Sequence, residues 1–173
     1  MDGDEIDLDE FVENFRKHLS EVDELAQVIL KGHLEVERHL DDVVDTIFFR
    51  PEYLRDARLN FHQKIRIAKA YSPDPTARDW QVIEGLNKAR NSIAHRAGVE
   101  KRAAEIAKLR EALSKWGTER SRLSNKSADE IEVVVLAAAM CSGFLLYLED
   151  SVRKVRDAIG KSLSVPTLLD AEE

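Results

Sequence analysis

The chain has 173 residues, of which 43% are apolar, 34% charged and 6% aromatic. That length suits one domain with a sizeable core and leaves little room for two. Seven glycines and four prolines exclude a collagenous or low-complexity chain, and the apolar fraction is too high for general disorder. The single cysteine, Cys141, cannot form an internal disulfide, which excludes a disulfide-stapled secreted scaffold and indicates a reducing compartment.

The termini and the apolar runs predict a soluble, cytoplasmic protein. Met1–Glu5 is acidic, which is the opposite of a secretory or transit peptide. The longest uncharged run, Val133–Leu148, has 16 residues, fewer than the ~20 that a membrane-spanning helix needs. We therefore expect no membrane partner and interpret this run as the central buried helix of a bundle, which other helices must enclose.

Charge is distributed unevenly along the chain. Residues 1–24 carry ten acidic and two basic side chains, a net charge of −8, whereas Arg78–Lys126 carries twelve basic and six acidic side chains, a net charge of +6. A local positive field can attract phosphate even on an acidic protein. Interspersed charges on a solvated helix face are the simpler interpretation. The acidic segment itself could serve solubility or compete internally for the basic surface.

Apolar residues recur at helical spacing along almost the whole chain, and no segment shows the alternation of a strand. Pro51 ends a long first helix, Asn60 can cap a second, and Ser72–Thr76 is a loop. Gly98 and Gly117 end the next two helices. The predicted helices are Glu21–Phe49 with an apolar pattern upstream of Ser20, Asn60–Tyr71, a helix from Ala77–Trp80 to Ala97, Val99–Trp116, and Asp129 to about Leu163.

These elements predict an all-α, single-domain bundle of four to six helices. We expect residues 1–20 to form a separate acidic segment and residues 21–163 to form the bundle. Residues 118–127 are polar and predict a loop, and residues 164–173 predict a mobile tail.

Most catalytic templates do not fit. The chain has no GxGxxG sequence, no P-loop, no CxxC pair and no GxSxG elbow. Cys141 lies in the most apolar segment, which favours a buried structural thiol over a nucleophile. His33 and Glu37 stand four residues apart and could share a helix face as metal ligands, but no second pair completes a site. We therefore expect no metal and no cofactor.

One segment, Leu86–Arg96, departs from the ordinary amphipathic pattern because it concentrates polar groups late in a helix. Asn87, Asn91 and His95 repeat every four residues and form one stripe. At about 100° per residue, Arg90 falls at the edge of the apolar face and His95 about 140° away from that face. One ideal helix therefore does not aim both side chains at one substrate atom. Either the helix distorts near its end, or a second copy completes the site across a two-fold axis.

The chemistry of these groups suits metal-independent cleavage of RNA at its own 2′-hydroxyl. An imidazole can exchange a proton near neutral pH, a guanidinium can hold a phosphate through two hydrogen bonds, and carboxamides can orient both. The pentavalent phosphorus needs positive charge beside it. The alternative interpretation is structural: Arg90, Asn91 and His95 satisfy one another and neighbouring loops as a polar network.

The hexapeptide Arg90–His95, Arg-Asn-Ser-Ile-Ala-His, resembles the Arg-x4-6-His signature of the HEPN superfamily in its common Arg-Asn-x-x-Ala-His form. Three upstream segments agree in order and spacing: Gly32–Glu37 on the long first helix, Leu59–Lys64 at the start of the second, and Leu86-Asn87 before the motif. The resemblance covers residues 30–96, and the final apolar helix fits the family bundle.

This resemblance implies an HEPN-like helical bundle that dimerises and brings two motifs into one cleft. Many members are metal-independent endoribonucleases that act as toxins of toxin–antitoxin pairs or in defence against phage. The implied partners are RNA, a second copy, and an antitoxin or other regulatory protein. The motif match makes His95 the general acid/base, Arg90 the phosphate and transition-state stabiliser, and Asn91 the residue that orients substrate or histidine. Four further residues are implied as substrate-binding or supporting: Asn87, Lys64, Glu37 and Arg96.

Three functions stay open from the sequence. The first and leading hypothesis is an HEPN-type ribonuclease. The second is a non-catalytic HEPN-like module for dimerisation, regulation or RNA binding, because the family also includes members that bind or dimerise without cleaving. The third is a transcriptional regulator, which is disfavoured because no helix-turn-helix stands out.

Overall fold

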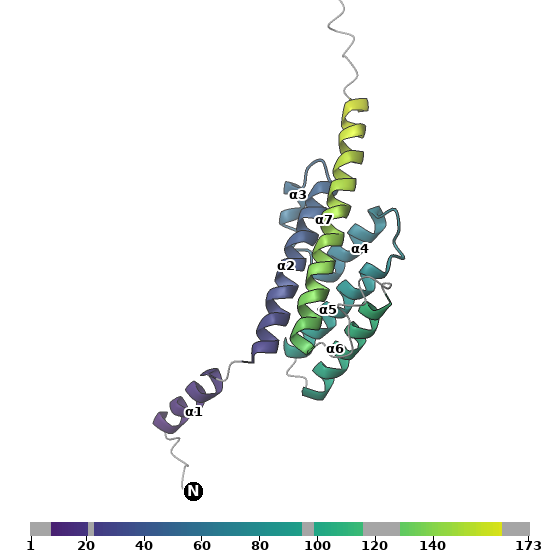
Figure 1. Ribbon diagram of the computed structural model, residues 1–173. Helices are drawn as coiled ribbons and strands as arrows, with labels where there is room; N and C mark the ends of the chain where they lie inside the picture. Colours follow the sequence, from purple (N-terminus) through teal and green to yellow (C-terminus); the bar gives the residue numbers. More distant parts are fainter. Residues whose placement is uncertain (1–7, 21–22, 95–98, 116–128, 164–173) are drawn as a thin grey trace, which may run out of the picture.

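The structure is a computed structural model of the chain, and it describes residues 8–20, 23–94, 99–115 and 129–163. Within those ranges it contains seven helices and no strand, which confirms the all-α prediction (Figure 1). The helices are α1 (Leu8–Ser20), α2 (Glu24–Ile47), α3 (Glu52–Arg55), α4 (Phe61–Tyr71), α5 (Arg78–Ala94), α6 (Val99–Ser114) and α7 (Glu130–Leu163).

Local backbone interactions explain the bounds of α2 and the presence of α3. Asp23 Oδ1 accepts a hydrogen bond from the Ala26 amide at 2.9 Å, so α2 begins after this cap and three residues later than predicted. The helix ends before Phe48, which takes extended backbone angles. Pro51 then precedes the four-residue turn α3. The sequence did not predict α3, because four residues are too few to show a helical period.

The start of α4 and the loop that follows it were predicted correctly. Asn60 Oδ1 accepts from the Gln63 amide at 3.0 Å, and Gln63 Oε1 accepts from the Asn60 amide at 2.9 Å. This reciprocal capping box fixes the first turn of the helix. Beyond Tyr71, Asp74 Oδ1 accepts from the Thr76 amide and hydroxyl at 2.9 and 2.6 Å, which closes a local turn.

Several predictions fall outside the described residues. The third predicted helix is described as far as Ala94, so its last turn and the Gly98 cap are not covered. The same holds for the predicted loop at 118–127 and the predicted tail at 164–173. The described ends of α6 and α7 lie within two residues of their predicted positions.

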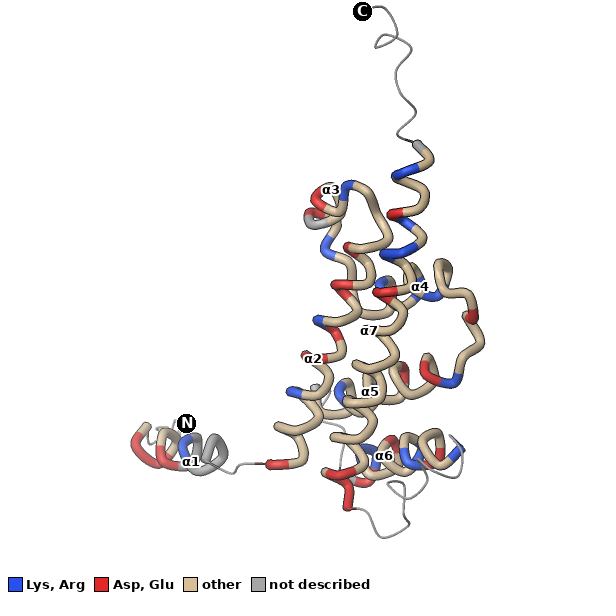
Figure 2. The backbone as a smooth tube through the Cα atoms, turned by 45° about the horizontal axis from the view of Figure 1, so that its top comes forward, with Lys and Arg blue, Asp and Glu red and all other residues tan. Residues whose placement is uncertain are grey.

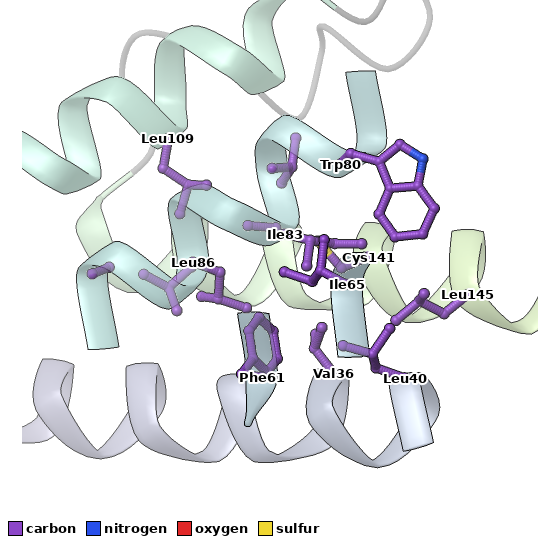
Figure 3. Packing of buried hydrophobic residues seen from close by; sticks show 14 of the residues in the cluster. Val36, Leu40, Phe61, Ile65, Trp80, Ile83, Leu86, Leu109, Cys141 and Leu145 are labelled. Carbon is purple, nitrogen blue, oxygen red and sulfur yellow. The ribbon is translucent and has the colours of Figure 1, made fainter. Parts of the chain in front are cut away.

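The bundle is built on α2 and α7, which lie side by side and run in the same direction (Figure 1). Helices α4 and α5 both pack on α2, and α6 packs on α5 and α7. Side chains from all five helices meet in one apolar core, which Figure 3 shows from close by. Fully buried members include Leu40, Ile65, Trp80, Leu109 and Leu145.

The prediction that other helices enclose α7 is wrong. Its buried face includes Val134 and Leu145, but Val135 is 53% exposed, Leu146 50% and Tyr147 73%. The physical reason is that α2, α5 and α6 pack on one side of α7 only, so the opposite side keeps its apolar residues in contact with solvent. A sequence that is apolar all round shows that a helix needs partners, but not how many it has within one chain.

By length and composition, α7 could also cross a membrane. A stretch within Glu130–Ser162 has a mean hydropathy of 2.2, and 39% of that stretch is buried inside the bundle. Core helices of soluble proteins pass the same test, so the finding is weak evidence. The expected absence of a membrane partner and the cytoplasmic location stay predictions.

Helix α1 stands apart from the bundle (Figure 1). Its first turn carries Asp9 and Glu10, and Figure 2 shows acidic residues along it. Leu8 is 68% exposed and Phe11 58% exposed, so this acidic segment also presents apolar side chains to solvent. The separate acidic segment expected at residues 1–20 is therefore an amphipathic helix from Leu8 onward.

Candidate functional site

The candidate motif begins near the C-terminal end of α5, at Arg90, four residues before Ala94. The buried face of this helix, formed by Val82, Leu86 and Ala89, fixes the helix against the core. Arg90 is partly buried beside this face, and its Nη1 donates to Asn91 Oδ1 at 3.2 Å. The guanidinium therefore lies at the boundary between core and solvent, where a phosphate could approach it.

Two members of the predicted site, His95 and Arg96, lie outside the described residues. Their positions relative to Arg90 stay predictions. The structure does place Arg90 and Asn91 together, immediately before them in the chain. It also shows that the helical backbone continues through Ala94, one residue short of the histidine.

A polar network joins α2, α4 and α5 at the same end of α5. His33 Nε2 lies 3.1 Å from Asn87 Oδ1, and His33 Nδ1 lies 3.8 Å from Glu37 Oε2. Lys64 Nζ donates to Glu37 Oε1 at 2.9 Å and lies 2.7 Å from Asp41 Oδ1. His33 thus contacts Asn87 and Glu37, and Glu37 in turn binds Lys64. Three of the predicted supporting residues therefore belong to one network.

His33 is almost fully buried and uncharged at neutral pH. Burial lowers the pKa of its imidazole, and the nearby charges of Arg90 and Lys64 lower it further against the opposing effect of Asn87 and Glu37. The contact of His33 Nε2 with Asn87 Oδ1 and that of Nδ1 with Glu37 hold both ring nitrogens beside polar partners. The Phe61 ring, at 4.4 Å between ring centroids, covers the imidazole and helps to exclude water.

Lys64 is engaged by two carboxylates. Burial opposes its charge, but the hydrogen bonds to Asp41 and Glu37 outweigh burial and raise the pKa of the ammonium group. The two carboxylates neutralise the ammonium charge locally, so Lys64 is a weak ligand for a phosphate. Its role is to link α4 to α2. Arg90, whose described hydrogen bond goes to a neutral amide, is the better phosphate ligand.

Sequence reasoning missed His33 and Asp41 as members of this network. The available signal was a histidine in the apolar stripe of a helix, since such a position demands a polar partner from another element. The partner, Asn87, is 54 residues away in sequence. Only packing of the helices reveals the pair.

Three of the described side chains in the basic segment, Arg102, Lys108 and Lys115, form ion pairs. Lys108 on α6 lies 2.8 Å from Glu105, and Lys115, directly after the end of α6, lies 2.9 Å from Glu111. These pairs support the simpler interpretation of interspersed surface charges for the described part of α6. Arg102 pairs with Asp23, the cap of α2, so one acidic residue of the segment 1–24 does contact the basic segment.

The structure also shows the surroundings of Cys141 and of the possible metal ligands. Cys141 is buried in the core as predicted, and burial raises the pKa of its thiol, so the thiol is protonated and unreactive. Among the described residues, no group of three or more His, Cys, Asp or Glu side chains is arranged to hold a metal ion.

Comparison with known proteins identifies no relative. No family model matches the chain, and neither the curated proteins nor the solved structures contain a significant match.

Proposed function

We propose that the protein is a metal-independent endoribonuclease of the HEPN type, acting in the cytoplasm as a toxin or a phage-defence effector. The observation that carries the proposal is the environment of Arg90, four residues before the end of α5: it is partly buried, bonded to the neutral amide of Asn91, and five residues before His95 in the sequence. A guanidinium in that environment keeps its charge available for an anionic ligand.

In the proposed reaction, the RNA 2′-oxygen loses its proton to a base and forms a bond to the adjacent phosphorus. The bond from phosphorus to the 5′-oxygen then breaks, and the leaving oxygen takes a proton. His95 exchanges these protons, and Arg90 neutralises the charge that accumulates on the phosphoryl oxygens. The products are a 2′,3′-cyclic phosphate and a 5′-hydroxyl, so no metal or cofactor is consumed.

A second copy of the chain completes the proposed site. On one ideal helix His95 lies about 140° from the apolar face at whose edge Arg90 sits, so one motif alone does not direct both at one phosphate. Two motifs facing each other across a two-fold axis would supply an arginine from one copy and a histidine from the other. RNA, a second copy and an antitoxin or other regulatory protein are the proposed partners.

The test is cleavage of mixed cellular RNA by purified protein in excess EDTA. We expect cleavage by the parent, and loss of cleavage in His95→Ala and in Arg90→Ala with the fold retained by circular dichroism. The control is Arg50→Ala, which removes one positive charge away from the motif. The Arg50 side chain is 79% exposed. Cleavage retained by both folded motif variants would falsify the proposal.

A second candidate function is a non-catalytic HEPN-like module for dimerisation, regulation or RNA binding. The observation in its favour is the network of His33, Asn87, Glu37 and Lys64, which links three helices and has a structural role by itself. This alternative expects no turnover of any RNA by the parent. It also expects Arg90→Ala to lower the thermal midpoint or to dissociate the dimer.

A further inference from the structure

A pocket of about 460 Å³ lies between α4, α5 and the loop that joins these two helices (Figure 1). Both helices pack on α2, and a side-chain bridge spans the space between them. In this bridge Lys69 Nζ of α4 donates to Glu84 Oε1 of α5 at 2.8 Å. The same ammonium group lies 5.8 Å from the centroid of the buried Trp80 ring. The bridge and the loop hold the walls in place, so the pocket exists before any ligand arrives.

One wall of the pocket is basic. His62 and Arg66 stand four residues apart on α4, line the pocket and are exposed. Neither side chain forms a hydrogen bond or an ion pair with a described residue. Glu84, which also lines the pocket, is already paired with Lys69. Arg66 therefore keeps its charge available for an anion, and His62 stands beside it as a further hydrogen-bond donor.

The pocket also has an apolar surface, which comes from Ile65, Ala70 and Pro75. The Ser72 hydroxyl in the lining is taken by the loop, because it donates to the Asp74 carbonyl at 3.1 Å. A pocket with an available cation and an apolar surface suits a ligand in which an anionic group is joined to a flat, less polar one. A nucleotide has this chemistry, since its phosphate is anionic and the face of its base is apolar.

The His62 end of the pocket is linked to the candidate motif through the polar network. Phe61, the residue before His62, covers the His33 imidazole, with 4.4 Å between the ring centroids. His33 Nε2 in turn lies 3.1 Å from Asn87 Oδ1, and Asn87 stands three residues before Arg90 on α5. One ring contact, one hydrogen bond and one helical turn thus join Arg90 to the start of the pocket. A few nucleotides of a single strand can span this separation.

We propose that the α4/α5 pocket binds a nucleotide of the RNA strand beside the cleavage site. Arg66 and His62 hold the phosphate, and the base lies on the apolar surface of the pocket. The inference rests on the proposed function in taking single-stranded RNA as the ligand. It assigns Arg66 and His62 to substrate binding, whereas the residues of the motif carry out the reaction.

The experiment measures, by fluorescence anisotropy, the binding of a single-stranded 2′-O-methyl RNA of about 12 nucleotides. This strand keeps its phosphates and bases but lacks the hydroxyl that attacks phosphorus, so binding is measured apart from cleavage. We expect Arg66→Gln to raise the dissociation constant about tenfold, because a hydrogen bond to a charged group is lost. The dependence of log affinity on log salt should become shallower by about 0.7, as for one lost phosphate contact. Arg50→Gln, the same change at another exposed arginine, should match the parent.

A second pair of variants tests the pocket without removing its basic residues. Ala70 is exposed in the lining, four residues after Arg66, so Ala70→Glu places a carboxylate beside the guanidinium. We expect this variant to raise the dissociation constant about tenfold as well, because the anion then competes with the phosphate. Ala158→Glu, an equal change of charge at an exposed position late in α7, should match the parent. Circular dichroism checks that each variant is folded.

The outcomes separate this inference from the proposed function. Cleavage of RNA by the parent, together with unchanged binding by folded Arg66→Gln and Ala70→Glu, would overturn the inference and leave the ribonuclease standing. No cleavage of any RNA, together with weaker binding by these two variants alone, would support the pocket and contradict the ribonuclease. Equal losses of binding in the control variants would overturn the inference, because they would indicate attraction by the overall charge. A parent that does not bind the strand would overturn it as well.

Discussion

The two sides of α2 hold the bundle together in different ways. On one side, His33 and Glu37 reach α5 and α4 through a few directional contacts to Asn87 and Lys64. On the other side, Gly32 lets α7 approach closely, and the contact is apolar and partly open to solvent. Directional polar contacts fix positions, whereas apolar packing contributes more of the stabilising free energy. The polar side therefore suits a site that needs defined geometry, and the apolar side suits association with another helix.

The largest expected loss of stability comes from adding a side chain at Gly32, where α2 and α7 approach closely. In Gly32→Leu, the added Cβ lies 3.1 Å from the Ala138 Cβ, so α2 and α7 must separate by a few tenths of an ångström to accept the side chain. We expect the free energy of unfolding to fall by about 2–3 kcal/mol in urea titrations. The control is Gly143→Leu, where a Cβ meets no atom within 4 Å and stability should be unchanged or raised by up to ~1 kcal/mol. Equal effects at both positions would contradict the close contact.

A smaller loss of stability is expected when the ion pairs of Lys64 with α2 are removed. Lys64→Met leaves Glu37 and Asp41 facing each other without a cation, with side chains that are 29% and 50% exposed. We expect a loss of about 1–2 kcal/mol, because partly buried acceptors lose their donor. Lys115→Met removes the exposed ion pair between Glu111 of α6 and Lys115 directly after it, and should cost no more than ~0.5 kcal/mol. A cost for Lys64→Met no larger than for Lys115→Met would show that the network does not join the helices.

The smallest expected effect is a pH dependence that belongs to His33. Because its pKa is lower in the folded protein than the ordinary value of 6.5, the unfolded chain binds more protons below that pH. Stability should therefore be full above pH 6.5 and fall as the pH decreases through the lowered pKa. Urea midpoints at pH 7.5 and pH 5 should differ more for the parent than for His33→Gln. An equal difference in both proteins would show that His33 does not cause the pH dependence of stability.

Local features of the fold could be predicted from the sequence, because they depend on neighbouring residues. The cap at Asn60 and the loop around Asp74 are set by side chains within three residues. The spans of α2, α4 and α7 follow from apolar spacing. How many neighbours each helix receives is not local, so the exposed face of α7 was not predicted.

The candidate site shows the same division. Arg90 and Asn91 could be singled out because they depart from an amphipathic pattern within one helix, and the structure places them in contact. The pairing of His33 with Asn87 could not, since the two residues meet only when α2 packs on α5. The role of His95 rests on the motif, because the residue lies outside the described ranges.

The most direct test of the ribonuclease proposal compares two oligonucleotides in excess EDTA. One is an RNA that the parent protein cuts at a mapped position, and the other is the same strand with a 2′-deoxy nucleotide on the 5′ side of that position. The account predicts that the RNA yields a 2′,3′-cyclic phosphate, that the deoxy strand is not cut there, and that His95→Ala cuts neither. Cleavage of the deoxy strand at the same position, or no cleavage of any RNA by the parent, would contradict the account.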